Sequence, residues 1–148
     1  MGFKIRAFNS ADRNALIEIF KLNTPQFFDK NEQKDFEDFL DKHADTYFVA
    51  EEDEKIVGCG GYYYLADKTV GRVSWDLFHP DSKGKGYGKH LVSHCIEMLK
   101  AEPIVKTLVV WTSQYAYGFY GKFGFETKEV RRNFWGPGID LYRMELNI

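Results

Sequence analysis

The sequence predicts a mixed α/β (α+β) fold built as a single domain over residues 1–148. Apolar side chains recur at three- and four-residue steps in some segments and at every second position in others, which are the periods of helices and strands. A strand pattern at 73–78 leads through a glycine-rich turn into a helical pattern that starts at His90. A chain of 148 residues is long enough to bury about two thirds of its unfolded surface.

The first half of the chain alternates between strand and helix patterns. A side-chain oxygen at Asn9 or Ser10 can cap a helix start, and the residues before Pro25 are disfavoured in a helix, so the first helix ends there. Glycines within 58–61 predict a bulge or a close neighbour inside a strand. The expected elements are a strand at 3–8, helices at 11–22 and 30–43, and a hairpin with strands at 46–51 and 55–64.

The second half begins with the strand at 73–78, which we expect to lie at the centre of the sheet. Pro80 ends this strand, and Pro103 ends the helix that follows it. Residues 133–140 are expected to form a loop because they include the sequence Trp-Gly-Pro-Gly. The remaining elements are a helix from 90, a strand at 107–111, a short helix at 116–123 and closing strands at 125–130 and 141–146.

Composition excludes several functional classes. The net charge of -2 lacks the basic excess typical of nucleic-acid binding, so no nucleic-acid partner is expected. No apolar run approaches the roughly 20 residues of a membrane helix, and the first residues lack a signal-peptide core, so we expect a cytoplasmic protein without a membrane partner. Cys59 and Cys95 are expected to be buried thiols. His90 and His94 lie one helical turn apart, but too few ligands lie nearby to predict a metal site.

The glycine turn (residues 83–89, KGKGYGK) has the features of an anion cradle. Glycines allow the backbone to approach a ligand, and the first amides of the following helix favour a phosphate. Two known phosphate loops do not fit: a P-loop needs Ser or Thr where His90 stands, and a dinucleotide fingerprint needs glycine at Lys89. A helix start without any ligand is the alternative interpretation.

Two segments resemble motifs of the GNAT family of N-acetyltransferases. The glycine turn resembles the signature Gln/Arg-x-x-Gly-x-Gly/Ala, with Lys83 at its first position. Residues 113–125 (SQYAYGFYGKFGF) resemble the pattern Asn-x-x-Ala-x-x-x-Tyr-x-Lys-x-Gly-Phe, with Ser113 in place of asparagine. Both motifs occur in the family's order and at about its usual separation. The resemblance implies a mostly antiparallel central sheet of about six or seven strands, flanked by about four helices.

The resemblance also implies the residues of the site. Acetyl-CoA would be the co-substrate, and its pantetheine arm would lie between the central strand and the strand at 107–111. Tyr120 matches the family's general acid, although packing under the cofactor is the alternative. The residues implied to bind acetyl-CoA are Leu77, Phe78, Lys83, Gly84, Lys85, Gly86, Tyr87, Gly88, Lys89 and Ser113.

The general base is less well defined by the sequence. Asp76 is the single carboxylate of the central strand, and we expect it to act as the base or to anchor a cationic amine. Glu51 could act through water instead, and in many relatives waters alone carry the proton. Arg72 stands where some relatives have a catalytic glutamate, so that assignment does not transfer.

The function implied is direct acetyl transfer from acetyl-CoA to a primary amine of a small molecule. A protein or peptide amine is an alternative acceptor. A module that binds acetyl-CoA without turnover and a nucleotide-binding domain are alternatives of other classes. Phe27 and Phe28 either line the acceptor pocket or close the core. Assembly as a homodimer stays open.

Overall fold

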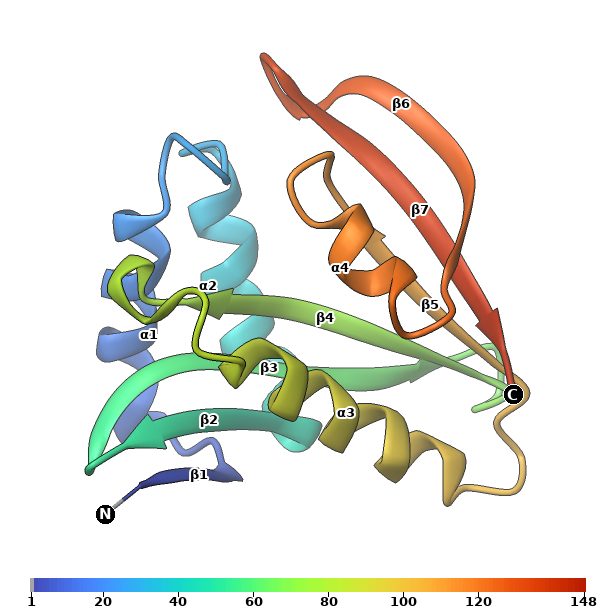
Figure 1. Ribbon diagram of the computed structural model, residues 1–148, viewed down its shortest axis with the longest axis horizontal. Coiled ribbons are helices and arrows are strands. Elements are labelled where there is room, and N and C mark those ends of the chain that lie inside the picture. The colour runs from blue at the N-terminus through green and yellow to red at the C-terminus, as the bar shows by residue number, and fades with distance from the viewer. Residues whose placement is uncertain (1) are drawn as a thin grey trace.

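The computed structural model describes residues 2–148, which form one seven-stranded sheet flanked by four α-helices (Figure 1). The strand order is β1-β2-β3-β4-β5-β7-β6, and every neighbouring pair is antiparallel except β4–β5, which is parallel. This confirms the predicted class and the mostly antiparallel sheet. The strands are β1 (Phe3–Ala7), β2 (Tyr47–Glu52), β3 (Lys55–Leu65), β4 (Val70–Phe78), β5 (Thr107–Thr112), β6 (Glu126–Gly136) and β7 (Ile139–Asn147). The helices are α1 (Arg13–Leu22), α2 (Glu32–Lys42), α3 (Tyr87–Lys100) and α4 (Tyr117–Gly121).

The helices cover the sheet from both sides and divide the core into two clusters. The helix α3 packs on one face with residues such as Tyr62 and Val73, while α1 and α2 pack on the other with residues such as Leu77. Side chains of β3 alternate between the two faces, because Tyr63 packs on the face opposite to Tyr62. The sheet therefore has an α3 face and an α1/α2 face.

A β-bulge in β4 interrupts the sheet at its centre. Cys59 pairs with Leu77 and Gly61 pairs with Ser74, so that two residues of β4 face the single Gly60 of β3. The extra residue is Trp75, which has a φ of +52°, a conformation that costs a non-glycine residue roughly 1–2 kcal/mol. The bulge reverses the alternation of β4, which confirms the irregularity predicted from the glycines in β3.

Packing and one hydrogen bond hold the bulge in place. The Trp75 indole lies among aromatic rings of the α1/α2 face, with ring-centroid distances of 5.1 Å to Phe36 and 6.3 Å to Phe28. The Tyr47 hydroxyl donates to the Trp75 carbonyl oxygen at 2.5 Å. These contacts offset the backbone strain at Trp75.

Some predicted boundaries were wrong. Residues 133–140 were expected to be a loop, but β6 continues to Gly136 and β7 begins at Ile139, so the turn is short. Side chains stabilise it, because Asn133 Oδ1 accepts from the Gly138 amide and Asp140 Oδ1 accepts from the Asn133 amide. The helix α3 begins at Tyr87, within the glycine turn, and not at His90.

Other predictions about the first half and the cysteines are confirmed. Asn9 accepts from the Ala11 amide and caps a short 3-10 turn that leads into α1. Cys59 and Cys95 are buried free thiols. Among residues 2–148, no helix is both long enough and apolar enough to cross a bilayer.

We expect Gly61→Ala to lower the free energy of unfolding by about 1–3 kcal/mol, because overpacking costs that much in a tight core. An added Cβ would overlap the Thr46 carbonyl oxygen and lie 2.7 Å from Tyr47 Cα, and neither backbone atom can rotate away. Gly118→Ala in α4 is the control, since its Cβ meets nothing within 4 Å. Urea unfolding measures both, and equal stabilities would contradict this account.

Candidate active site

A cleft of about 710 Å³ opens where β4 and β5 diverge. The two strands pair in parallel from Val70 with Thr107 to Val73 with Val110, and beyond that point they separate (Figure 1). The bulge at Trp75 begins just after the last pair and turns β4 away from β5. The edge of β4 from Ser74 to Phe78 therefore faces the cleft without a neighbouring strand.

The glycine turn forms one end of this cleft. Gly84 and Gly86 have φ values of +85° and +81°, and a Cβ added at either would meet nothing within 4 Å. Gly86 precedes α3 and provides no side-chain cap, so the first amides of the 14-residue helix have no partner inside it. Open space, free amides and the positive end of the helix dipole together suit a phosphate group.

The lysines of the glycine turn take different directions. Lys83 Nζ lies 3.4 Å from the centroid of the Phe27 ring, and its partial burial lowers the pKa of the ammonium. Lys85 is outside the cleft lining, and its Nζ lies 3.9 Å from Glu52 Oε1. Lys89 lines the cleft. The three lysine side chains therefore do not converge on one point, and the backbone amides of the turn are the better candidates to hold a phosphate.

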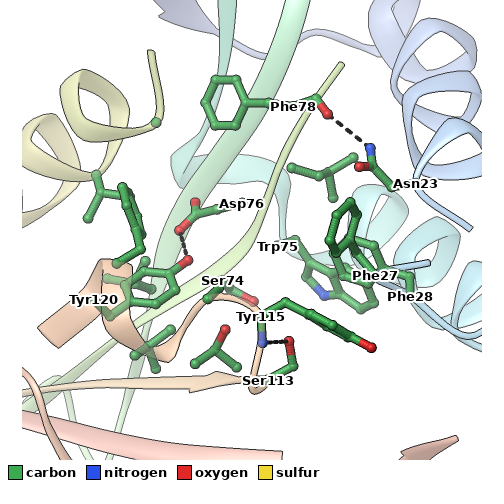
Figure 2. A pocket seen from close by; sticks show the side chains of 18 of the residues that line it. Asn23, Phe27, Phe28, Ser74, Trp75, Asp76, Phe78, Ser113, Tyr115 and Tyr120 are labelled. Carbon is green, nitrogen blue, oxygen red and sulfur yellow. Dashed lines mark hydrogen bonds between the residues drawn. The ribbon is translucent and has the colours of Figure 1, made fainter. Parts of the chain in front are cut away.

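Asp76 and Tyr120 meet on the α3 side of the cleft. The Tyr120 hydroxyl donates to Asp76 Oδ2 at 2.5 Å, and the other carboxylate oxygen is buried without a hydrogen-bond partner (Figure 2). Burial raises the pKa of Asp76 to about 7, which the hydrogen bond from Tyr120 counteracts only in part. Burial and the adjacent carboxylate raise the pKa of Tyr120 well above its usual range. The pair can hold and exchange protons near neutral pH.

Most of the residues predicted for the site line this cleft. Lys85 is the exception described above. Glu51 also lies elsewhere: its carboxylate binds Arg6 at 2.9 Å and Lys4 at 3.5 Å, so the structure gives no support to Glu51 as a base. The predicted residues that line the cleft are Asp76, Leu77, Phe78, Lys83, Gly84, Gly86, Tyr87, Gly88, Lys89, Ser113 and Tyr120.

The α1/α2 side of the cleft is aromatic. Phe28 packs against Phe20 and Trp75, while Phe27 packs edge-on against Tyr115 at 5.4 Å (Figure 2). Phe28 thus extends the core, and both Phe27 and Phe28 line the cleft; that they line an acceptor pocket stays a prediction.

The hairpin of β6 and β7 closes over this aromatic side. A Cβ at Gly136 would lie 2.5 Å from the Asp29 carboxyl carbon, so the hairpin touches the segment between α1 and α2. Trp135 lines the cleft, and its indole N–H donates to the Thr112 carbonyl at 3.0 Å. The contact narrows the opening on this side.

Sequence reasoning missed several contributors. Asn23 follows the last residue of α1, and its side-chain amide donates to the Phe78 carbonyl and so ties α1 to the end of β4. Glu32 lines the cleft, and burial raises its pKa to about 7. The sequence did contain a signal for the role of Glu32. It stands in the first turn of a predicted helix, where a glutamate commonly accepts from a backbone amide that precedes the helix, and its carboxylate accepts from the Asp29 amide.

The geometry agrees with what comparison with known proteins finds. The profile described as "Acetyltransferase (GNAT) family" matches residues 14–125. The chain belongs to this family. The matched residues include the strand, the glycine turn and the helix at the mouth of the cleft.

Relatives of this GNAT chain share its fold at low identity. An uncharacterised N-acetyltransferase of Methanocaldococcus jannaschii is 30% identical over 102 residues, which is 64% of this chain and 45% of that protein. The chain spans less than half the length of the curated relatives it matches. The ribosomal-protein-S18-alanine N-acetyltransferase from Escherichia coli superposes with a TM-score of 0.79 at 21% identity, covering 99% of this chain and 94% of that one. An aminoglycoside 6'-N-acetyltransferase complexed with coenzyme A gives a TM-score of 0.77 at 15% identity, with coverage of 97% and 96%.

We expect the stability of this GNAT chain to fall as pH rises from about 5 to 7. Native Asp76 and Glu32, with pKa values of about 7, retain protons that the unfolded chain has released, so each group contributes up to about 1.4 kcal/mol per pH unit of decline. Asp76→Asn should make this decline less steep, and Glu32→Gln should do so independently. Urea unfolding across this pH range gives the slope, and an unchanged slope in Asp76→Asn would contradict the assignment.

Proposed function

We propose that this chain is an acetyl-CoA-dependent N-acetyltransferase that transfers the acetyl group directly to the primary amine of a small molecule. The observation that carries the proposal is that one cleft joins an open glycine cradle, an unpaired strand edge and the Asp76–Tyr120 pair. These are the parts that acyl transfer requires: a site for the diphosphate, donors along the pantetheine arm and a group that handles protons.

The residues present fit coenzyme A. The free amides after Gly86 would hold its diphosphate, and the edge of β4 around Leu77 and Phe78 would pair with its pantetheine arm. Acetyl-CoA supplies an activated acetyl thioester and, after transfer, a thiolate that must be protonated. Lys83 lies against Phe27 and contributes charge without the planar fork that arginine would bring.

The Asp76–Tyr120 pair would move the protons. Tyr120 Oη would turn its proton from Asp76 to the departing sulfur, and protonated Asp76 would then donate to Tyr120 Oη across the same 2.5 Å separation, so that the hydrogen bond between them reverses direction. The carboxylate that results can accept, through the same tyrosine, the proton that the amine nitrogen loses on forming its bond to the acetyl carbon. The pKa of about 7 allows Asp76 to hold and release a proton near neutrality.

The closed α1/α2 side supports a small acceptor. The contact of Gly136 with Asp29 and the position of Trp135 restrict this end of the cleft, whereas a peptide chain needs an open groove. The Escherichia coli neighbour acts on a ribosomal protein, and the neighbour with bound coenzyme A acts on an aminoglycoside, so the fold serves both kinds of acceptor. An amine panel that includes free amino acids, polyamines and amino-terminal peptides, assayed by release of free thiol from acetyl-CoA, tests the proposal.

We expect Gly86→Ala to weaken coenzyme A binding at least tenfold. Its Cβ would extend into open space that the diphosphate needs, and its positive φ costs alanine roughly 1 kcal/mol. Gly138→Ala is the matched control, because this hairpin glycine has a φ of +79° and equally open surroundings outside the cleft lining. Calorimetric titration gives the affinity of each variant for coenzyme A. Equal affinities of Gly86→Ala and Gly138→Ala would mean that the diphosphate does not bind at the glycine turn.

We expect Tyr120→Phe to lower kcat by about 10²- to 10⁴-fold, the usual contribution of a general acid, with little change in coenzyme A affinity. Tyr117→Phe is the control, because Tyr117 lies on the same helix but is exposed and stacks on Tyr142 at 4.5 Å. Steady-state kinetics with the best amine measures kcat. Unchanged turnover at saturating substrate would remove Tyr120 as proton donor, and coenzyme A binding without turnover of any amine would favour a non-catalytic binding module.

A further inference from the structure

Arg72 lies at the point where β4 and β5 begin to separate. It pairs with Tyr63 of β3 and with Val109 of β5, one residue before the last β4–β5 pair. Its guanidinium carbon is 4.7 Å from the Trp111 ring centroid and 5.8 Å from that of Tyr63. The two aromatic rings fix the guanidinium on the α1/α2 side of the cleft.

This guanidinium has no anionic partner in the part of the chain that the structure describes. No carboxylate oxygen lies within 4.0 Å of it, and its Nε atom is buried without a hydrogen bond. The nearby Glu129 and Glu145 are both held by Arg143, at 3.1 Å and 2.7 Å. A buried donor without a partner typically costs the fold about 1–3 kcal/mol. Interactions within the described chain therefore do not account for the presence of an arginine at this position.

The acidic groups that line the cleft are also engaged. Glu32 accepts from the Asp29 amide, and Asp76 accepts from Tyr120. An anion that enters on the α1/α2 side would therefore find in Arg72 a guanidinium that no carboxylate of the described chain neutralises.

The position of Arg72 relates it to the reaction. The free edge of β4, along which the pantetheine arm would lie, begins two residues further on at Ser74, and two residues of strand span roughly 6.6 Å. Arg72 lies beyond the end of this edge that is remote from the glycine turn, so a group bound by Arg72 would be part of the acceptor and not of coenzyme A.

We propose that Arg72 binds a carboxylate of the acceptor, so that the acceptor is a small amine that also carries a carboxylate, as amino acids do. This inference rests on the proposed function. A planar guanidinium matches a carboxylate with two parallel hydrogen bonds, which the terminal nitrogens Nη1 and Nη2 of Arg72 can donate.

The test compares amino acids with their own carboxamides as acceptors. With the unmodified chain we expect kcat/KM to be about 10- to 100-fold higher for the acid, because charge-assisted hydrogen bonds discriminate to that extent. Arg72→Gln should remove this preference by lowering kcat/KM for the acid while leaving that for the amide. Arg72→Lys should restore part of it. Arg132→Gln, which removes an exposed arginine outside the cleft lining, should leave the preference intact.

A binding measurement separates this inference from the proposed function. Calorimetry with N-acetylamino acids and their amides, which are products and need no turnover, should show tighter binding of the acid to the unmodified chain and no difference in Arg72→Gln. Equal use or equal binding of acid and amide by the unmodified chain overturns the proposal. So does an Arg72→Gln variant that loses acid and amide activity in parallel, because that result assigns Arg72 a purely structural role. Failure of acetyl-CoA to bind or to react would instead overturn the proposed function.

Discussion

The bulge at Trp75 is the constraint on which the site depends. One extra residue opposite Gly60 ends the parallel pairing of β4 with β5 and leaves the edge from Ser74 to Phe78 open. The same residue reverses the alternation of side chains, so that Asp76 points to the α3 face while Trp75 enters the aromatic cluster of the other face. A regular strand would have placed Asp76 on the α1/α2 face, away from Tyr120. The strained φ of Trp75 is therefore part of the architecture of the cleft.

Opposing electrostatic effects meet at Asp76. Burial favours the neutral acid, while the hydrogen bond from Tyr120 favours the carboxylate, and burial has the larger effect because the second carboxylate oxygen has no partner. The folded chain thus keeps a proton at a site where the unfolded chain would lose it. This arrangement lowers the free energy of unfolding at neutral pH. It also keeps an exchangeable proton next to the Tyr120 phenol. Loss of stability in exchange for a shifted pKa is common at functional sites.

Local patterns made much of the fold predictable, and long-range contacts explain what was missed. Strand and helix periods identified the elements up to small boundary shifts, and the glycines of β3 indicated the irregular pairing with β4. Residues 133–140 were predicted to be a loop because Trp-Gly-Pro-Gly is typical of loops. The strands continue through most of this segment because hydrogen bonds of the Asn133 and Asp140 side chains stabilise a short turn, which the local sequence does not indicate. Asp76 and Tyr120 were each singled out, but 44 residues separate them, and only the packing of α4 beside β4 brings them together. The same holds for Asn23 and Phe78, which lie 55 residues apart.

The division of the chain into two faces has a consequence for how such a protein can change over generations. The glycine turn and Tyr120 belong to the α3 side of the cleft, while Phe27, Phe28 and Arg72 belong to its α1/α2 side, and the two sides meet where Lys83 lies against the Phe27 ring. Under the proposed function, replacing Phe27 would alter which acceptor fits, whereas Phe28 packs on Trp75 and also supports the bulge. Gene duplicates of this chain would then diverge towards new amines in small steps that leave the glycine turn and Tyr120 in place.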